Sequence, residues 1–452
     1  MTTDTTTTAT ATTELSRLES TAMTATLWTI AAYGSSQLLR VVNSLILTRL
    51  LHPAAFGMMT LVSTLIIGIT LLSDIGLQPS VIQSKRGDDP IFLNTAWTLQ
   101  ILRGGALWIA ALVLAWPLSL FYHDRQLLAV FPALALTTIF SGFNSTSLLT
   151  LSRHMGVRRL FALEFSTQIF TLIVTVTWAW FSPTVWALVG GTIAASLYHM
   201  ALSHMRMFSS IRNRLCWDRE SLASIIHFGK WILVGTGFFF FASQADRLIL
   251  GKLISLSLLG VYGIAFSISD IPRQVILAFS SRVGYPFIAK IIHLPQVEFR
   301  ATFLRYRFYV LLAGAALLSL MANWGGLVIL KLYDSRYHDA SWMVPILALG
   351  LWHTLLYTTT SPVLFSLGKS QYNAYGNAAY CVTMLAGIPL GFHSYGMLGA
   401  VIAVAAGDFP LYLVTQYGAS REGIRPVWQD LQTTIVFLAL LAGGFFLRRA
   451  IG

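Results

Sequence analysis

The chain has 452 residues, of which 55% are hydrophobic and only 11% are charged, and its mean hydropathy is +0.67. A soluble domain carries about a quarter charged residues, so this composition excludes an ordinary water-soluble fold. The net charge of +12 is spread over alternate short loops instead of a patch or tail, which argues against nucleic-acid binding. Many apolar runs reach the ~20 residues that a helix needs to cross a bilayer. The chain is therefore predicted to be an all-α integral membrane protein.

The chain begins with a Thr- and Ala-rich stretch, 1–26, that lacks the basic start, short apolar core and cleavage site of a secretory signal. We interpret it as a disordered cytoplasmic tail. The region 27–207 is predicted to form an N-lobe of six membrane helices, with boundaries set by apolar runs between polar turns. These helices are expected at 27–50, 56–79, 93–121, 127–151, 160–181 and 184–207.

A basic, polar stretch at 208–222 is the best boundary between two lobes, and we interpret it as a cytoplasmic loop. The region 223–418 is predicted to form a C-lobe that also has six helices. These are expected at 223–250, 256–287, 303–331, 340–366, 372–392 and 396–418. The remaining 419–452 is predicted to hold a cytoplasmic loop and an additional C-terminal helix near 430–448.

The basic residues predict which loops face the cytoplasm, because cytoplasmic loops carry an excess of Lys and Arg. One set of alternate loops holds Lys85, Arg86, Arg153, Arg158, Arg159, Arg206, Arg212, Arg214, Arg219, Lys290, Arg300, Arg305, Arg307, Lys369, Arg421 and Arg425. The opposite set holds only Arg49, Arg125, Lys252, Lys331 and Arg336. The first set and the N-terminus are therefore expected to be cytoplasmic. Arg448 and Arg449 do not fit this pattern if the last helix crosses the membrane.

The second half of the chain repeats part of the first. An offset of 203 residues places Trp28–Gly57 on Trp231–Gly260 without a gap, and it aligns a Trp and two Gly in addition to Leu and Ile. Six predicted crossings separate the two copies, so both enter the membrane in the same direction. This arrangement predicts a parallel repeat with a pseudo-two-fold axis along the membrane normal, which is typical of transporters that hold their cargo between two lobes.

Basic residues within predicted spans are candidates for cargo binding, because ionisable groups are costly in a membrane. Arg40 shares a helical face with Gln37, Asn43 and Ser44, and this stripe is expected to face a cavity or to make interhelical hydrogen bonds. Arg103 precedes two glycines in the third helix. Lys230 lies in the cytoplasmic third of the seventh helix, where its side chain could also extend to the membrane surface.

Acidic residues are the candidates for proton or Na⁺ coupling. Asp270 and Arg273 have an i, i+3 ion-pair spacing on either side of Pro272, and a structural pair is as good an interpretation as a working site. Asp408 lies inside the twelfth helix and is the acid most clearly within the membrane. Asp74 could cap a helix end before Gly76. Asp246 is followed directly by Arg247, which favours a structural pair.

The chain contains none of the sequence signatures of an enzyme or a metal site. Cys216 and Cys381 are too far apart in the sequence to indicate a disulfide or metal framework. There is no Walker loop, no H-E-x-x-H and no nucleophile elbow. We therefore expect a protein that is not an enzyme and that has neither a cofactor nor a metal.

Three stretches resemble bacterial polysaccharide-export flippases of the multidrug/oligosaccharidyl-lipid/polysaccharide (MOP) superfamily. Leu47–Gly57 matches the L-x-R-x-L-x-P-x-x-F/Y-G pattern that joins the first two helices of these proteins. Ser73–Leu77, followed by Val81–Gln83, is similar to the end of their second helix. Asp246–Lys252 and Leu259–Tyr262 are similar to the corresponding region of their second lobe.

The resemblance implies a MATE-like fold of two six-helix lobes and a flippase for lipid-linked oligosaccharide in the bacterial inner membrane. The cargo would be a polyprenyl-diphosphate-linked repeat unit for exopolysaccharide, capsule or O-antigen, with membrane lipids and the polymerase and export proteins of the pathway as partners. The expected ligands of the diphosphate are Arg40, Arg103, Lys230 and Arg273. Some of Tyr33, Trp97, Trp231 and Tyr262 could stack on sugars, although packing is the better interpretation for most of them.

Two other functions are compatible with a chain of this kind. A cation-coupled drug or small-molecule exporter on a related fold would favour an acidic cavity, whereas bases within the spans are at least as prominent here. A polysaccharide polymerase or ligase would carry a large outer loop with basic catalytic residues, whereas all the predicted outer loops are short. The sequence therefore favours the flippase.

Overall fold

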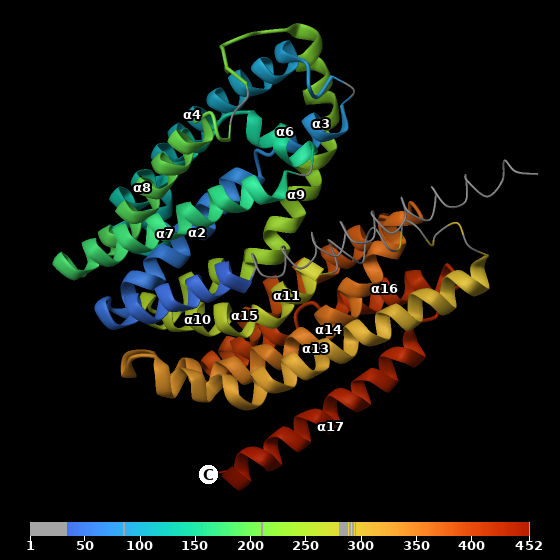
Figure 1. Cartoon of the computed structure of the whole chain (residues 1–452). Coiled ribbons are helices and arrows are strands. Elements are labelled where there is room, and N and C mark those ends of the chain that lie inside the picture. Colours follow the sequence, from blue (N-terminus) through green and yellow to red (C-terminus); the bar gives the residue numbers. More distant parts are fainter. Residues whose placement is uncertain are drawn as a thin grey trace, which may run out of the picture.

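The computed structural model describes residues 34–451, except 85, 155, 209–210, 280–287, 289–290, 292 and 294. Within these residues every regular element is a helix, and Figure 1 shows that the helices gather into two bundles. The predicted all-α fold is therefore confirmed. Among the described residues, eight helices are long and apolar enough to cross a membrane, or up to nine if one bent pair counts as a single span.

The first bundle contains the helix 34–50 and α2 to α8. The labelled helices are α2 (Pro53–Leu71), α3 (Leu77–Gln83), α4 (Pro90–Tyr122), α5 (Leu127–Gly142), α6 (Ser147–Arg153), α7 (Val157–Phe181) and α8 (Val185–Ser203). Local sequence explains several helix starts. Pro53 and Pro90 each occupy the first turn of a helix, where a missing N–H costs nothing, and Asp89 caps α4 by accepting from the Ile91 N–H.

Two predicted spans of this bundle end earlier than expected. The predicted helix 56–79 ends with α2, and the chain turns through a left-handed Gly76 into the short α3. The predicted helix 127–151 is divided into α5 and α6, which meet at an angle of 68°. Hydropathy reports the length of an apolar run but not the bend within it, so these breaks were not predicted.

The second bundle contains α9 to α17. Its elements are α9 (Arg219–Leu253), α10 (Leu256–Ser269), α11 (Ile271–Phe279), α13 (Gln296–Leu332), the short 3₁₀ helix η2 (Ser335–Tyr337), α14 (Ala340–Ser366), α15 (Gln371–Ala406), α16 (Phe409–Arg421) and α17 (Val427–Ile451). The predicted helix 256–287 breaks at Asp270, between α10 and α11.

The last predicted spans of the second bundle are connected by a very tight turn inside α15. The backbone leaves helical geometry at Tyr395 and Gly396, and Gly396 has a φ of 58°. A Cβ atom added to Gly391 would lie 2.5 Å from the carbonyl oxygen of Gly399, so the two arms of the turn pack backbone to backbone. A second break before α16 leaves Asp408 at the start of that helix.

The two bundles touch where α2 crosses α10. A Cβ atom added to Gly57 would lie 1.8 Å from the carbonyl oxygen of Leu256, and one added to Gly260 would lie 2.1 Å from that of Pro53. Only glycine fits at such a crossing. Gly57 and Gly260 are equivalent positions of the sequence repeat, so this contact lies where a pseudo-two-fold axis between the bundles would pass.

Two matching contacts join the bundles at the turns predicted to face outward. From the first bundle, the Tyr122 hydroxyl donates to the Leu248 carbonyl oxygen at 3.3 Å, and the Lys252 Nζ lies 2.9 Å from the His123 Nδ1. These two contacts hold the end of α4 against the α9–α10 turn.

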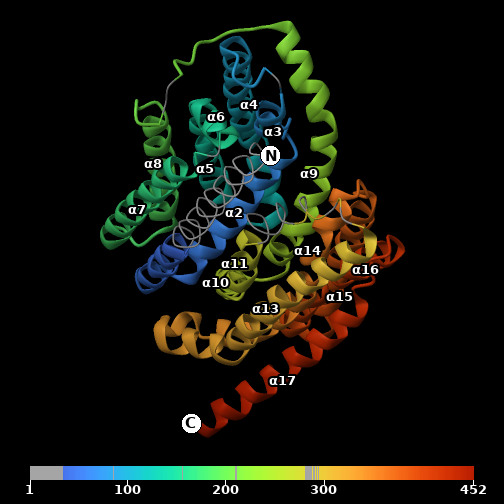
Figure 2. The same cartoon turned by 45° about the vertical axis from the view of Figure 1, so that its right-hand side comes forward.

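The second bundle makes the corresponding contact with the turn before α2. The Tyr333 hydroxyl donates to the Ser44 hydroxyl at 3.3 Å, and Arg336 donates to the carbonyl oxygens of Thr48 and Arg49 at 3.2 and 3.1 Å. Hydrogen bonds from Arg336 also lower the pKa of Asp334. Asp334 therefore stays ionised, and paired with Arg336, at pH values at which an aspartate in water would already bind a proton. Figures 1 and 2 show the bundles diverging away from this end.

Candidate functional site

Two adjoining cavities lie where the bundles meet. The first has a volume of about 520 Å³ and is lined mainly by the helix 34–50, α2 and α10. The second has a volume of about 350 Å³ and is lined mainly by α9, α14 and α15 in the second bundle. Ile67, Arg247, Phe266 and Asp270 line both cavities, so the cavities share a boundary at these side chains.

Two arginines give the first cavity its positive charge. Arg40 projects from the helix 34–50 together with Gln37, Asn43 and Ser44, all of which line this cavity. Arg247 comes from α9, and its guanidinium carbon lies 4.6 Å from the centre of the Phe266 ring. Neither arginine is part of a salt bridge in the described part of the chain. The Arg247 Nη1 donates to the side-chain oxygen of Gln244, which is a neutral partner. Guanidinium groups that line a cavity without a carboxylate partner are suited to an anionic ligand.

Arg273 lines the second cavity beside its ion-pair partner. Its Nη2 donates to Asp270 Oδ2 at 2.9 Å, and Gln274 Nε2 donates to the same oxygen at 2.9 Å. This is the i, i+3 pair that the sequence allowed, and it lies at the break between α10 and α11. The positive charge of Arg273 is thus largely balanced within the protein.

Of the other two predicted cationic ligands, Arg103 lines neither described cavity. Arg103 Nη2 donates to the Thr70 carbonyl oxygen at 2.6 Å and its Nε to the Ser73 hydroxyl at 3.3 Å. Arg103 therefore caps the end of α2, and we do not include it among the cavity cations. The backbone of Lys230 belongs to α9, but its side chain lies outside the described part of the structure.

The candidate coupling acids occupy three different environments. Asp408 lines the second cavity, accepts from the Thr354 hydroxyl at 2.5 Å and lies 2.6 Å from His353 Nε2. Asp74 accepts from the Gly76 N–H at 2.9 Å and so caps the turn after α2. Asp246 is buried and accepts from the Tyr262 hydroxyl at 2.6 Å.

Arg247 is a cavity residue that sequence reasoning missed. Its neighbour Asp246 suggested a structural pair, but Asp246 points to Tyr262 and leaves Arg247 to the cavities. The repeat held the necessary signal, because Arg247 aligns with Ser44 at the same offset of 203 residues. Ser44 belongs to the polar stripe of Arg40, so the repeat predicts that the matching face of α9 also lines the cavity.

The predicted aromatic stacking residues are used for packing where they are described. Tyr262 is fully buried beside Asp246. Trp97 packs edge-on against Phe143 and donates to its carbonyl oxygen at 3.4 Å. Tyr33 and the side chain of Trp231 lie outside the described part of the chain.

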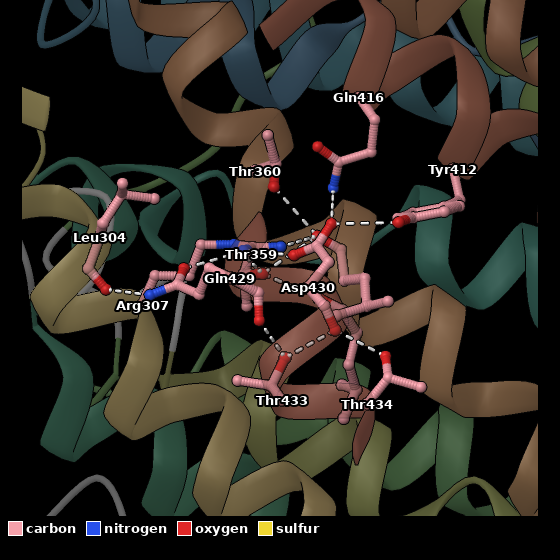
Figure 3. Close-up of polar contacts among 12 residues, drawn as sticks. Leu304, Arg307, Thr359, Thr360, Tyr412, Gln416, Gln429, Asp430, Thr433 and Thr434 are labelled. Atoms are coloured by element: carbon pink, nitrogen blue, oxygen red, sulfur yellow. Dashed lines mark hydrogen bonds and ion pairs between the residues drawn. The ribbon is translucent and has the colours of Figure 1, made fainter. Parts of the chain in front are cut away.

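A buried ion pair lies apart from both cavities and holds α17 in place. Arg307 is fully buried, and its Nη1 lies 2.6 Å from Asp430 Oδ1. Figure 3 shows the surrounding network, in which Arg307 also donates to the Thr359 hydroxyl at 3.0 Å and the Tyr412 hydroxyl donates to Asp430 at 3.1 Å. Arg307 was assigned to a cytoplasmic loop from the sequence, but it lies inside α13 because that helix begins at Gln296.

Comparison with known proteins identifies the family. Residues 46–341 match the family described as "Polysaccharide biosynthesis protein". The chain is 21% identical over 327 residues to the lipopolysaccharide biosynthesis protein WzxC of Escherichia coli (strain K12), an alignment covering 72% of this chain and 65% of WzxC. It is 23% identical over 257 residues to the amylovoran biosynthesis protein AmsL of Erwinia amylovora, covering 57% of this chain and 66% of AmsL. The matches thus span just under two thirds of the length of these relatives.

Solved transporter structures share the fold. An inward-facing MATE-family multidrug transporter of the MOP superfamily matches with a TM-score of 0.68 at 14% identity, covering 89% of this chain and 95% of that one. The lipid II flippase MurJ in an inward closed conformation matches with a TM-score of 0.64 at 9% identity, covering 94% and 98%. At such identities the likeness concerns the fold alone. The family match over residues 46–341 shows that this multi-pass membrane protein belongs to the family described as "Polysaccharide biosynthesis protein".

Proposed function

We propose that this protein is a flippase that moves a polyprenyl-diphosphate-linked oligosaccharide across the bacterial inner membrane by alternating access. The observation that carries the proposal is the cavity between the bundles, which is lined by Arg40 and Arg247, neither of which forms a salt bridge among the described residues. The names of the relatives, which refer to lipopolysaccharide and amylovoran biosynthesis, support a cargo that serves the synthesis of exopolysaccharide, capsule or O-antigen.

The charge of the cavity favours an anionic cargo. Removing a diphosphate from water is costly unless cations and hydrogen-bond donors replace the lost hydration. Arg40 and Arg247 offer planar, bidentate donors at the boundary between the bundles. Arg273 contributes less, because Asp270 already neutralises it. Lys230 remains a proposed ligand from its position in α9.

The closed contacts at the outer turns set the proposed direction of access. With the N-terminus in the cytoplasm, the turns around Tyr122 and Arg336 face the periplasm and close the cavity on that side. The cargo would then enter from the cytoplasmic side, where the bundles diverge. Transport requires these contacts to open while the bundles close at the other end.

Asp408 and Asp270 are the proposed sites of ion coupling. Both carboxylates line the second cavity, and Asp408 is held by a hydroxyl and an imidazole. A proton or Na⁺ bound there would change the charge of the cavity between steps of the cycle. Asp74 is less suited to this role because it caps a turn.

A deletion strain tests the function directly. Surface polysaccharide would be measured together with the membrane leaflet in which the polyprenyl-diphosphate oligosaccharide accumulates. A flippase predicts lost export with the glycolipid trapped in the cytoplasmic leaflet. Glycolipid that reaches the periplasmic leaflet without forming polymer would instead place the protein at polymerisation or ligation.

A cation-coupled small-molecule exporter is the second candidate function. The observation that favours it is the pair of carboxylates, Asp270 and Asp408, in the second cavity, together with a fold shared with a multidrug transporter. Unchanged surface polysaccharide in the deletion strain, with no second flippase present, would favour this function.

A further inference from the structure

The second cavity differs in chemistry from the first. Its lining combines aromatic rings with groups that both donate and accept hydrogen bonds. The aromatic residues are Phe239, Phe266, Tyr357 and Tyr380, and the neutral polar residues include Ser243, Gln244, Thr354 and Asn377. A cavity of this size is within the usual range for a small polar ligand.

Apart from Arg247 at the boundary with the first cavity, the charged groups that line the second cavity have partners within the protein. Arg273 is paired with Asp270, and Asp408 is held by Thr354 and His353. This cavity is therefore poorly suited to a second phosphate-binding site. It is suited to a neutral molecule with many hydroxyl groups, because each hydroxyl both donates and accepts hydrogen bonds. Carboxylates accept hydrogen bonds, and amides and phenols both donate and accept them.

Sugar rings have the chemistry that this lining demands. A sugar presents hydroxyls at its rim, which need hydrogen-bond partners once water is excluded, and an apolar C–H face, which packs against aromatic rings. Tyr357 and Tyr380 offer both a ring and a hydroxyl, as amphipathic aromatic residues do at binding sites. Both side chains are only half-buried, so part of each ring faces the cavity.

The boundary between the cavities fits the covalent structure of the cargo. Arg247 and Phe266 line both spaces, with the guanidinium stacked over the ring. In a lipid-linked oligosaccharide the diphosphate lies between the lipid and the first sugar. A diphosphate bound at Arg247 would therefore have its sugar end beside the second cavity and its lipid end in the first, between the bundles.

We propose that the second cavity is the glycan subsite, which binds the sugars next to the diphosphate, with Tyr380 and Asn377 as direct contacts. This inference rests on the proposed flippase function. It divides recognition into two parts. Arg40 and Arg247 bind the diphosphate that every such glycolipid carries, whereas the side chains of α14 and α15 select among glycans.

Binding to two lipids tests this division. The purified full-length protein would be titrated with undecaprenyl diphosphate and with the undecaprenyl-diphosphate repeat unit extracted from the native host. The wild type is expected to bind the glycolipid more tightly than the bare lipid. Tyr380→Leu and Asn377→Ala are expected to remove most of that difference, roughly tenfold for a lost buried hydrogen-bonded contact, and to leave the affinity for the bare lipid unchanged.

Three variants make the comparison specific. Tyr380→Phe keeps the ring and should retain part of the glycan preference. Tyr375→Leu changes a tyrosine of the same helix that is 67% exposed and does not line either described cavity, so it should behave as the wild type. Arg247→Ala should weaken the binding of both lipids alike.

The outcomes separate this inference from the proposed function. A wild type that prefers the glycolipid, with the preference unchanged in Tyr380→Leu and Asn377→Ala, would overturn the glycan subsite and leave the flippase intact. Equal affinity of the wild type for the two lipids would also overturn the subsite. A wild type that binds neither lipid would overturn the flippase and the subsite together.

Discussion

At the scale of single residues, the cavity cations differ in how well the sequence revealed them. Arg40 was predictable because its polar neighbours recur at helical spacing, and the structure places that stripe on the first cavity. Arg247 was hidden because sequence adjacency suggested a bond with Asp246, whereas adjacent helical residues point in different directions. Arg103 donates to the Thr70 carbonyl oxygen and the Ser73 hydroxyl at the end of α2, which gives it a structural role, and its role as a diphosphate ligand stays a prediction.

Removing either arginine of the first cavity should impair transport. We expect Arg40→Ala and Arg247→Ala each to reduce flipping by roughly tenfold or more, because a charge-assisted hydrogen bond contributes about 1.5–3 kcal/mol. Arg273→Ala should have a smaller effect, since Asp270 already balances that charge. Transport would be measured in membranes with matched expression. Wild-type rates in both Arg40→Ala and Arg247→Ala would contradict the assignment.

Neutralising Asp408 should uncouple transport from an ion gradient. In proteoliposomes, Asp408→Asn is expected to lose the stimulation of transport by an imposed proton or Na⁺ gradient, while cargo still moves down its own gradient. Asp74→Asn serves as the control, because Asp74 caps a turn and lines neither described cavity. Gradient-driven transport that persists in Asp408→Asn would place the coupling elsewhere.

At the scale of elements, helix existence was easier to predict than helix shape. Long apolar runs located most of the helices, because a span must satisfy its own backbone hydrogen bonds. The breaks before α6, α11 and α16 were missed because hydropathy measures how apolar a run is and contains no information on a change of helix direction within that run. Two of these three breaks supply residues to the second cavity.

The helix α17 is an integral part of the second bundle. Asp430→Leu would leave the fully buried guanidinium of Arg307 without its counter-charge, which typically costs about 3–5 kcal/mol. We expect a clear loss of thermal stability in detergent for this variant. The double variant Arg307→Met/Asp430→Leu should recover most of the loss, because neither charge then remains buried. A double variant no more stable than Asp430→Leu would show that the ion pair itself is not what holds α17.

At the scale of the whole molecule, the crossing of α2 and α10 controls how closely the bundles approach. Gly57→Leu is expected to push the bundles apart at this point and to favour a state open to the periplasm. Thr60 lines the first cavity, so Thr60→Cys would report this opening. The variant would be labelled with a membrane-impermeant maleimide added from outside, in a background in which Cys216 and Cys381 are replaced by serine.

Gly105, a glycine of α4, provides a matched control for that experiment. A Cβ atom at Gly105 would meet nothing within 4 Å, so Gly105→Leu should leave the labelling of Thr60→Cys unchanged. Increased labelling in Gly57→Leu alone would support the crossing as the point of closure. Equal labelling in both variants would show that the bundles are held together elsewhere.

The segment between the bundles is more constrained than its predicted role as a loop implied. The backbone N–H groups of Arg214 and Cys216 donate to Asn94 and Thr98 of α4 at 2.9 and 3.0 Å. At its end, hydrogen bonds from Ser221 lower the pKa of Asp218, which keeps this N-cap of α9 charged. The N-terminal end of α9 is thereby fixed to the first bundle, so relative movement of the bundles requires a change within α9 and not only in the segment before it.

The meeting of Gly57 with Gly260 also bears on how such a chain could arise. If the two halves descend from one half-length ancestor, two copies of that ancestor would have associated with a single glycine facing itself across the dimer axis. One mutation at that codon would then have altered both sides of the contact at once. After fusion of the gene copies, each side could change separately, which would free the surrounding halves to diverge into one that binds the invariant part of a ligand and one that binds its variable part.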